Sequence, residues 1–593
     1  MNHPLPPARI ECDLLVIGSG AGGLTTAVTA RKHGLDVVVI EKEDVFGGTT
    51  AFSGGVLWIP GNALARQAGI ADSRPAAIEY IRNETGPFYD AQAVEAFLDA
   101  GPEMVDFLER EGAMKFVPAL YPDYHPSVPG GVDIGRSILA APFDLRELGA
   151  ERARMRPPLQ TITFIGMMFN SSSPDLKHFF NVTRSLTSFT YVARRLAAHL
   201  KELALYRRGV SVTSGNALAA RLAKACFDLG IPIYTATGAR TLVRDGGTIT
   251  GALATGPQGS EIRIDARRGV VLACGGFSHD LARITQAYPH LRRGGEHLSP
   301  VPAGNTGDGL HLAEQAGGQA QIRFKESAAW MPVSKVPLGN GRFGVFPHLL
   351  DRYKPGIIGV TRRGLRFCNE SESYHDVGAA MIEACADEHE TAMWLLCDQA
   401  TLSKYGIGYA KPAPMPVGRL IRNGYLIKGG TLAELARNAG IDAGGLERTV
   451  AEYNAGAVHG EDRQFGRGRS TFNRYLADPE HRPNPCVAPI GKGPYYAVKL
   501  VMGDLGTFDG LNTSVAGEVL DEAGHPIPGL YSVGNDRASI MGGNYPGAGI
   551  TLGPIMTFAY LTARHIAGAR QAAPVPQQSA AAHTNHEEHR HAA

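Results

Sequence analysis

The 593-residue sequence contains no long apolar run and almost no net charge. No stretch approaches the 18 apolar residues of a membrane-spanning helix, and Met1–Cys12 lacks the apolar core of a signal peptide. The 58 Lys and Arg residues nearly cancel the 57 Asp and Glu residues, which leaves a formal net charge of +1. That balance provides no basic surface for a nucleic acid. We therefore expect a cytoplasmic protein with no transmembrane segment and no nucleic-acid partner.

Cysteine is scarce and scattered along the chain. The seven cysteines form no CxxC pair and no spacing typical of metal ligands, so we predict neither a disulfide framework nor a metal site. Reduced thiols are the expected state of Cys12, Cys226, Cys274, Cys368, Cys385, Cys397 and Cys486. Residues 571–593 are rich in Ala and Gln and contain several histidines, and we predict that this tail is disordered.

Glycine, by contrast, is abundant at 73 residues, and its first cluster follows a short apolar run. Asp13–Ile17 predicts a buried strand, Gly18–Gly23 a glycine-rich turn, and Leu24–His33 a helix. A second strand, Val37–Ile40, ends at Glu41. This order of elements predicts a dinucleotide-binding unit.

Several positions of the turn have a physical role in such a unit. Gly18 permits the tight turn, Gly20 lets a pyrophosphate approach the backbone, and Gly23 allows the helix to pack closely on the strand. Glu41 can accept hydrogen bonds from ribose hydroxyls. The cofactor-binding residues expected here are Gly18, Gly20, Ala21, Gly22, Gly23, Glu41 and Lys42.

The loop that follows favours FAD over NAD. Residues 46–55, with the sequence FGGTTAFSGG, form a second backbone-rich loop for which a simple NAD domain has no need. Such a loop can lie along the pyrophosphate, the ribityl chain and the flavin ring. The residues expected to contact the cofactor here are Gly48, Thr49, Thr50, Ser53, Gly54 and Gly55.

With these motifs the chain resembles the fumarate reductase/succinate dehydrogenase flavoprotein superfamily. The resemblance extends over about residues 10–570 through the segments 266–277 (ARRGVVLACGGF), 305–309 (NTGDG) and 529–535 (GLYSVGN). Some relatives tether FAD through a histidine in the loop after the first acid, and this loop has none, so we predict non-covalent FAD. Further expected cofactor contacts are Ala273, Gly275, Asp308 (which could instead order its turn), Gly534, Asn535, Gly549, Thr551 and Leu552.

The predicted fold class is α/β: a discontinuous, Rossmann-like FAD-binding domain with an inserted α+β cap. We expect residues 8–320 and 495–570 to form the FAD-binding domain. Residues 321–494 should form the cap, which would place the substrate cleft at a domain interface. A helix that begins near Pro554 should direct its N-terminus at the flavin, where its dipole stabilises negative charge.

A second glycine cluster, residues 542–549 (GGNYPGAG), indicates the chemistry. The Tyr545 hydroxyl and the Gly549 N–H are two donors that can grip one carbonyl oxygen, as an oxyanion hole does. Fumarate reductases place arginines in this segment and shortly before a stretch that resembles residues 364–370. Tyr545 and Tyr353 occupy those positions here, so we expect no dicarboxylate clamp, although Arg352 lies nearby.

The closer resemblance is to the 3-oxosteroid Δ1-dehydrogenases. It implies desaturation next to a ketone: Tyr545 and Gly549 polarise the carbonyl, a tyrosine pair that includes Tyr124 removes the α proton, and flavin N5 accepts hydride from the β carbon. Free tyrosine has a pKa of about 10, so the base needs a neighbour that lowers this value. The matching segments are 545–549 (YPGAG), 551–554 (TLGP), 46–49 (FGGT), 53–55 (SGG), 58–60 (WIP), 121–124 (YPDY) and 129–131 (PGG).

The chain departs from that family at the second tyrosine of the pair, which the family carries in the cap. By spacing, Phe346 occupies that position here. Either Tyr124 works alone, or His348 or Tyr353 supplies the base, or the substrate differs. A 3-oxosteroid is the expected substrate, with a smaller cyclic ketone as the alternative and an unidentified electron acceptor. An ene-reductase and a non-catalytic flavoprotein are the competing hypotheses. The basic, aromatic residues 179–208 leave a peripheral membrane contact as an alternative to a solvated helix pair.

Overall fold

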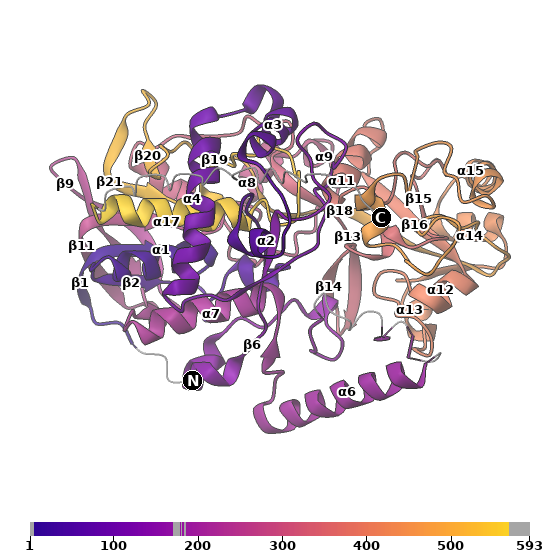
Figure 1. The fold of residues 1–593 in the computed structure, drawn as a ribbon, viewed down its shortest axis with the longest axis horizontal. Coiled ribbons are helices and arrows are strands. Elements are labelled where there is room, and N and C mark those ends of the chain that lie inside the picture. The colour runs from indigo at the N-terminus through magenta and orange to yellow at the C-terminus, as the bar shows by residue number, and fades with distance from the viewer. Residues whose placement is uncertain (1–4, 170–177, 180, 183–184, 569–593) are drawn as a thin grey trace, which may run out of the picture.

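Two β-sheets and the helices around them form the fold in the computed structural model, which describes residues 5–169, 178–179, 181–182 and 185–568 (Figure 1). The first sheet has eight strands, in the order β20-β21-β11-β1-β2-β8, with the β9–β10 hairpin added at β11. β1 pairs in parallel with β2 and β11, as do β2 with β8 and β11 with β21. The strands are β1 (Arg9–Ile17), β2 (Val37–Ile40), β8 (Ile233–Tyr234), β9 (Gly238–Asp245), β10 (Thr248–Thr255), β11 (Glu261–Leu272), β20 (Glu518–Leu520) and β21 (Pro526–Ser532).

The predicted strand, glycine turn, helix and second strand are all present at the start of the chain. β1 contains the predicted Asp13–Ile17, α1 spans Ala21–Lys32, and β2 spans Val37–Ile40. Gly18 has a φ of +112°, and a Cβ on Gly23 would lie 2.0 Å from the Gly18 carbonyl oxygen. Only glycine permits this turn and this close approach of helix to strand. The predicted α/β unit is therefore confirmed.

Both faces of the first sheet are buried, which explains the unbroken apolar runs of its strands. Leu14 of β1 faces a core that it shares with α1, α7 (Ser214–Asp228) and α17 (Leu552–Ile566). Leu15 faces a second core, shared with the β9–β10 hairpin and α10 (Asp308–Gln315). The sheet is thus held between a helical layer and a mixed layer.

The second sheet is antiparallel and lies to the right of the first in Figure 1. Its order is β14-β13-β18-β16-β15, and β17 also pairs with β18. Helix α11 (Tyr374–Ala384) packs on β13, and α14 (Leu432–Ala439) packs on β17. The strands are β13 (Ala328–Gly339), β14 (Arg342–Pro347), β15 (Ile358–Val360), β16 (Ala392–Asp398), β17 (Ile427–Gly429) and β18 (Tyr495–Thr507).

One expected boundary does not match this pairing. Residues from 495 onward were expected to return to the FAD-binding domain, but β18 is an inner strand of the second sheet. Its buried apolar side chains pack with those of β13 and β16, so the chain rejoins the first sheet only with β20 and β21. The domain limits as a whole stay a prediction.

A small third sheet and several further helices complete the described part. The third sheet has the order β3-β5-β4, and α4 packs along α17. These elements are β3 (Val56–Trp58), β4 (Phe116–Pro118), β5 (Ser137–Ala140), α3 (Arg74–Thr85) and α4 (Ala91–Arg110). The remaining ones are α2 (Ala63–Gln67), β6 (Phe143–Asp144), β7 (Ser211–Val212), α8 (Leu281–Ala287), α9 (Pro289–Arg292), β12 (Ala320–Gln321), α12 (Gln399–Tyr405), α13 (Gly418–Arg422), α15 (Ala443–Ala457), α16 (Thr471–Tyr475) and β19 (Gly510–Leu511).

A single helix, α6 (Leu186–Tyr206), stands out from the rest of the protein at the bottom of Figure 1. Its surface exposes several large apolar side chains, of which Leu186 is the most exposed. Within the part of the chain that the structure describes, no helix is both long and apolar enough to cross a membrane. The alternative of a peripheral membrane contact at residues 179–208 stays untested, and the predicted disordered tail at 571–593 lies outside the described residues.

A buried cluster of charges fixes the segment that leads into α11. Arg366 Nη2 lies 2.7 Å from Glu370 Oε2 and 2.9 Å from Asp462 Oδ2, and all three side chains are at most 1% exposed. Arg467 adds a contact of 3.3 Å to Glu370. Burial alone would raise the pKa of Glu370, but the charge of Arg366 outweighs it and lowers the pKa. Paired charges therefore hold the start of α11 in place.

Arg366→Met should lower the free energy of unfolding by about 3–5 kcal/mol, because it leaves two buried carboxylates without their cation. Arg362→Met is the matched control, since Arg362 is 58% exposed. Its surface pair with Glu390 contributes about 1 kcal/mol or less. Denaturant titration of both variants measures the difference, and equal stability of the two would contradict the role assigned to the cluster.

Candidate functional site

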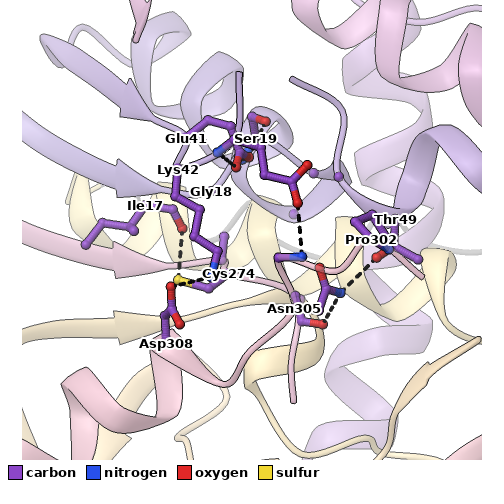
Figure 2. Close-up of a pocket in the computed structure, with 18 of the residues that line it drawn as sticks. Ile17, Gly18, Ser19, Glu41, Lys42, Thr49, Cys274, Pro302, Asn305 and Asp308 are labelled. Atoms are coloured by element: carbon purple, nitrogen blue, oxygen red, sulfur yellow. Dashed lines mark hydrogen bonds and ion pairs between the residues drawn. The ribbon is translucent and has the colours of Figure 1, made fainter. Parts of the chain in front are cut away.

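A cavity of about 850 Å³ lies at the carboxyl ends of β1 and β11 (Figure 2). Its wall combines the glycine turn, the loop after β2 and later parts of the chain at Arg156, 237–239, 273–275, 302–312, 534–535 and Ile555. The predicted cofactor residues that line it are Gly18, Gly20, Ala21, Gly22, Glu41, Lys42, Gly48, Thr49, Thr50, Ala273, Gly275, Asp308, Gly534 and Asn535.

The geometry of this cavity fits a dinucleotide. α1 begins at Ala21, whose N–H donates to Thr50 Oγ1 at 2.9 Å. The next two N–H groups, those of Gly22 and Gly23, have no acceptor among the described residues. A helix N-terminus with unpaired N–H groups is suited to a pyrophosphate. At Gly534, also in the wall, a Cβ would meet no atom within 4 Å, so the cavity reaches the backbone there.

Charged side chains order the rim of the cavity (Figure 2). Glu41 Oε2 accepts hydrogen bonds from Ser19 Oγ at 2.6 Å and from Ser19 N at 3.1 Å. Lys42 Nζ donates to Asp308 Oδ2 and to Thr306 Oγ1, each at 2.7 Å. Thr306 Oγ1 in turn donates to Asp308 Oδ1 at 2.7 Å. Asp308 therefore both lines the cavity and orders its turn, while Ser19 and Thr306 were not predicted.

The remaining predicted cofactor residues lie outside the wall of this cavity in the described structure. Ser53 orders the loop, because its Oγ donates to Thr50 O at 2.8 Å and accepts from Gly55 N at 3.1 Å. Thr551 lines a second, adjoining cavity. As cofactor contacts, the residues of this group stay predictions: Gly23, Ser53, Gly54, Gly55, Gly549, Thr551 and Leu552.

Three buried tyrosines from distant segments meet in a second part of the site. The Tyr124 ring stacks on the Tyr545 ring, with centroids 5.6 Å apart and 14° between the planes. Tyr374 begins α11. Its ring centroid lies 5.9 Å from that of Tyr124 and 5.1 Å from that of Tyr545, with interplanar angles of 83° and 70°. The Tyr124 and Tyr374 hydroxyl oxygens are 3.4 Å apart. The ring centroid of Phe472 lies 4.5 Å from that of Tyr124, and the centroid of Phe508 lies 6.1 Å from that of Tyr545.

Asp123 joins the loop of Tyr124 to the second glycine cluster. Its buried carboxylate accepts hydrogen bonds from Trp58 Nε1 and Arg136 Nη1, each at 2.8 Å. The two loops also bond through their backbones, since Tyr124 N donates to Pro546 O at 2.8 Å. Burial raises the pKa of Asp123 to about 6, against the opposing charge of Arg136. The position of Tyr124 thus depends on a buried carboxylate rather than on a helix or strand.

Burial favours the neutral form of the three phenols. It raises the pKa of Tyr124 and Tyr374 well above 10, with the neighbouring tyrosines adding to the effect, and it also raises the pKa of Tyr545. A neutral phenol donates a hydrogen bond. The cluster is therefore suited to grip a carbonyl oxygen in a site that excludes water.

Gly549 is constrained to remain a glycine. Its φ is +95°, and a Cβ there would lie 2.6 Å from the Val56 carbonyl oxygen. Its own carbonyl accepts from Trp58 N at 3.0 Å, whereas no described residue accepts a hydrogen bond from its N–H. This N–H, four residues from Tyr545, is therefore unpaired among the described residues, and its role toward a carbonyl oxygen stays a prediction.

The structure does not bring the other two candidate bases to the cluster. His348 is fully buried, with Nδ1 2.7 Å from Asp351 and Nε2 also hydrogen-bonded. The Tyr353 ring packs edge-on against Phe472, with centroids 5.9 Å apart, and no ring contact among the described residues joins Tyr353 to the three tyrosines. Both side chains are engaged in packing the cap, which spacing along the sequence could not reveal.

Tyr374 is the cluster member that the sequence analysis missed. It follows the stretch 364–370 by four residues and begins α11. Ser373 caps this helix by accepting a hydrogen bond from Asp376 N at 3.1 Å. A serine followed three residues later by an acid is the signal that could have placed a helix start, and hence a buried tyrosine, at this point.

His125 connects the two layers beside the cluster. Its Nδ1 lies 3.0 Å from Glu84 on α3, and its Nε2 lies 2.9 Å from Asp376 on α11. Burial alone would lower the pKa of His125, but the hydrogen bonds to Asp376 and Glu84 outweigh it and raise the pKa to about 11. The imidazolium therefore clamps α11 to α3. His125 follows Tyr124 in the sequence, and its partner Asp376 lies two residues after Tyr374.

A smaller cavity of about 390 Å³ adjoins the first. The two share Gly534, Asn535 and Ile555, and the smaller one extends to Phe508 beside the tyrosines. Its other lining residues are Thr507, Arg537, Ala538, Ser539, Ile540, Ile550, Thr551, Pro554 and Phe558. Thr551 and Pro554 mark the start of α17, so a ligand here meets the positive end of that helix dipole. No described residues form a group of three or more potential metal ligands.

A family model of the FAD binding domain matches residues 13–552 of the chain. The chain is 44% identical to the 4-oxocyclohex-2-ene-1-carboxylate 5-dehydrogenase of Sinomonas cyclohexanicum, over 96% of each protein. It is 36% identical to the 3-oxosteroid 1-dehydrogenase of Mycobacterium tuberculosis, over 94% of this chain and 98% of that protein. The crystal structure of the 3-ketosteroid Δ1-dehydrogenase from Sterolibacterium denitrificans in complex with 1,4-androstadiene-3,17-dione matches with a TM-score of 0.85 at 34% identity, covering 94% of this chain and 99% of that one.

The clamp at His125 makes stability depend on pH in a defined direction. The pKa is about 11 in the folded protein and about 6.5 in the unfolded chain, so the stability it contributes is fully present below pH 6.5 and is lost as the pH rises toward 11. In that window this group lowers the free energy of unfolding by about 1.4 kcal/mol per pH unit. His125→Gln should flatten the slope between pH 7 and 9 in denaturant titrations. His525→Gln, at a site 79% exposed, should leave the slope unchanged, and an equally steep slope in both variants would contradict the clamp.

Proposed function

Because the chain belongs to the FAD binding domain family of the fumarate reductase/succinate dehydrogenase flavoproteins, we propose that it desaturates the Cα–Cβ bond next to a ring ketone. The chain is an FAD-dependent dehydrogenase of cyclic ketones, and FAD, when bound, supplies the hydride acceptor. The residues of the larger cavity would hold it. The observation that carries the finer proposal is the meeting of Tyr124, Tyr374 and Tyr545 beside a cavity that continues from the dinucleotide site.

Tyr545 and Gly549 would grip the ketone oxygen of the substrate. Tyr545 keeps its proton because burial raises its pKa, and the Gly549 N–H has no other acceptor in the described structure. Two donors directed at one oxygen stabilise the negative charge that develops when the neighbouring C–H bond loses its proton. This charge stabilisation makes the α proton acidic enough for a weak base.

Tyr124 and Tyr374 would form that base. Tyr124, as the phenolate, would accept the α proton, and Tyr374 would stabilise that phenolate by a hydrogen bond. The two hydroxyl oxygens are 3.4 Å apart, and the hydrogen bond from Tyr374 lowers the pKa of Tyr124 against the effect of burial. Tyr374 would thereby be the second member of the tyrosine pair. From the sequence, Phe346 occupies the expected position of that member, and His348 and Tyr353 are the alternatives. His125 would act as a positioning residue, because it ties the helix of Tyr374 to the layer that carries Tyr124.

Two substrate classes follow from the relatives, a 3-oxosteroid and a smaller carbocyclic ketone. We favour the smaller ring, because the relative named for an oxocyclohexene carboxylate is 44% identical over 96% of this chain, whereas the steroid enzyme is 36% identical over 94% of it. The absence of the expected cap tyrosine at Phe346 supports the same choice. This choice reverses the expectation from the sequence, in which a 3-oxosteroid came first and the smaller cyclic ketone was the alternative.

Anaerobic flavin bleaching tests the proposal directly. Purified protein would be mixed with 4-oxocyclohexane-1-carboxylate, 4-androstene-3,17-dione, cyclohexanone or succinate while the oxidised flavin band is followed. Bleaching by a ring ketone, with the enone as product, is the expected result. Bleaching by the steroid alone would refute the smaller ring. If no ketone bleaches the flavin and an enone reoxidises the reduced protein, the enzyme is a reductase and the proposal fails.

The tyrosine pair predicts unequal effects for two substitutions. Tyr374→Phe should lower kcat by about 10²–10³, because it removes one member of the acid–base pair. It should also slow the exchange of the ketone α protons with deuterated solvent, a step that needs no flavin turnover. Tyr353→Phe is the matched control, since the Tyr353 hydroxyl only donates to Glu372 O at 3.2 Å. Similar losses in both variants would remove Tyr374 from the mechanism.

Tyr545→Phe should lower kcat by about 10²–10³ while FAD remains bound, because it deletes one of the two donors to the developing oxyanion. Stopped-flow flavin reduction and the flavin content of the purified variant measure the two quantities. Undiminished reduction would favour a non-catalytic flavoprotein or a different oxygen site.

The absence of histidine from residues 41–55 predicts that the flavin is not covalently attached. Acid precipitation should therefore release all of the flavin absorbance into the supernatant. Fluorescence retained on the denatured protein band in a gel would contradict this prediction.

A further inference from the structure

One buried cation in the smaller cavity has no partner in the described structure. Arg537 is only 9% exposed, and its Nη1 has no hydrogen-bond partner among the described residues. No described carboxylate lies within ion-pair distance of it. Its guanidinium stacks on Phe558, 3.6 Å from the ring centroid, and lines the cavity with Phe508, Ile540 and Ile550.

The other buried arginines of the described chain are all hydrogen-bonded through their side chains. Some pair with carboxylates, as Arg366 does with Glu370, and Arg352 donates to backbone carbonyls. The full set of such arginines is Arg136, Arg154, Arg156, Arg352, Arg366, Arg467 and Arg564. Arg537 therefore departs from the rule that the rest of this protein follows, and it does so in the wall of a cavity.

A buried, unpaired guanidinium is unfavourable unless a ligand supplies the missing charge. Burial lowers the pKa of Arg537 to about 10, so it remains a cation at neutral pH. The nearest acid that favours the charge is Asp90, which is engaged as the N-cap of α4. A ligand in this cavity therefore meets a desolvated positive charge. The complementary group is a carboxylate, because the planar guanidinium can donate two parallel hydrogen bonds to its two oxygens.

We propose that Arg537 binds a carboxylate on the substrate, and that this enzyme therefore acts on a ring ketone that carries an acid group. The inference rests on the proposed function, since it needs the ketone oxygen at Tyr545 and Gly549. The cavity of Arg537 extends to Ile550, the residue after Gly549, and to Phe508, whose ring centroid lies 6.1 Å from that of Tyr545, so the proposed carboxylate and ketone sites adjoin each other. An uncharged steroid would leave the guanidinium unpaired.

The reduced flavin is the competing source of negative charge, because the same cavity shares Gly534 and Asn535 with the dinucleotide site. The two sources make different predictions. A carboxylate on the substrate makes Arg537 important for charged ligands only. A charge on the flavin would make it equally important for every substrate and would lower the flavin midpoint potential when the cation is removed.

The test compares 4-oxocyclohexane-1-carboxylate with its methyl ester, which has the same ring and ketone but no charge. Arg537→Met should lower kcat/KM for the acid by about 100-fold and change that for the ester by less than about threefold. Arg323→Met is the matched control, because Arg323 is an exposed arginine that also stacks on a phenylalanine, at 5.1 Å from the Phe324 centroid. It should leave both substrates unaffected.

Binding of cyclohexanecarboxylate, which has no ketone, measures the anion site without turnover. Its Kd, followed by the flavin spectrum, should rise about 100-fold in Arg537→Met, whereas cyclohexanecarboxamide should bind both proteins alike. If Arg537→Met does not fold, Arg537→Lys keeps the charge without the planar fork and should reduce the preference for acid over ester by about tenfold.

Equal losses for acid and ester, a shifted flavin potential with unchanged Kd, or no preference of the unmodified enzyme for the acid would each overturn the proposal. Failure of the proposed function has a different signature. In that case no ring ketone would reduce the flavin, while cyclohexanecarboxylate would still bind the enzyme and lose affinity in Arg537→Met.

Discussion

The arrangement of the candidate active site depends on the hydrogen bonds that the buried Asp123 carboxylate accepts. This carboxylate accepts hydrogen bonds from Trp58 and Arg136 and lies where the loop of Tyr124 bonds to the backbone of the second glycine cluster. Neither loop has a helix or strand of its own to hold it there, so a desolvated, fully paired charge performs that task. The stacking of Tyr124 on Tyr545, and with it the proposed carbonyl site, depends on this carboxylate.

Charges in this protein show two different uses of burial. The Arg366 cluster and the His125 clamp are fully paired, and both fix the position of α11, which carries Tyr374. Arg537 is buried at comparable depth without a partner. Paired charges give a rigid frame, whereas an unpaired charge in a cavity keeps its interaction free energy for a ligand. The rigid frame and the proposed specificity element therefore use different charges.

The parts of the site that could be predicted from the sequence are those encoded in one short segment. The glycine turn at 18–23 must be glycine because a Cβ at Gly23 would meet the Gly18 carbonyl at 2.0 Å, and such constraints leave a local pattern. Tyr545 and Gly549 lie four residues apart, so one short motif contains both predicted donors. The second base could not be found this way: Phe346, His348 and Tyr353 were chosen by spacing from a motif, whereas Tyr374 reaches Tyr124 across 250 residues of chain. The assignment of β18 to the wrong sheet has the same cause, because an apolar strand carries no mark of its partner.

The sequence by itself determined the α/β class and the flavin cofactor, because the glycine turns depend on backbone conformations that only glycine adopts. It also predicted two donors for a carbonyl oxygen, Tyr545 and Gly549. The tertiary structure alone decided which tyrosines meet, which histidine clamps two layers together, and which arginine remains without a partner. Those outcomes depend on distances between segments far apart in the chain and on which charges burial leaves unpaired. Residue type and spacing along the sequence contain neither quantity, since both arise only when the two sheets and their loops pack against each other.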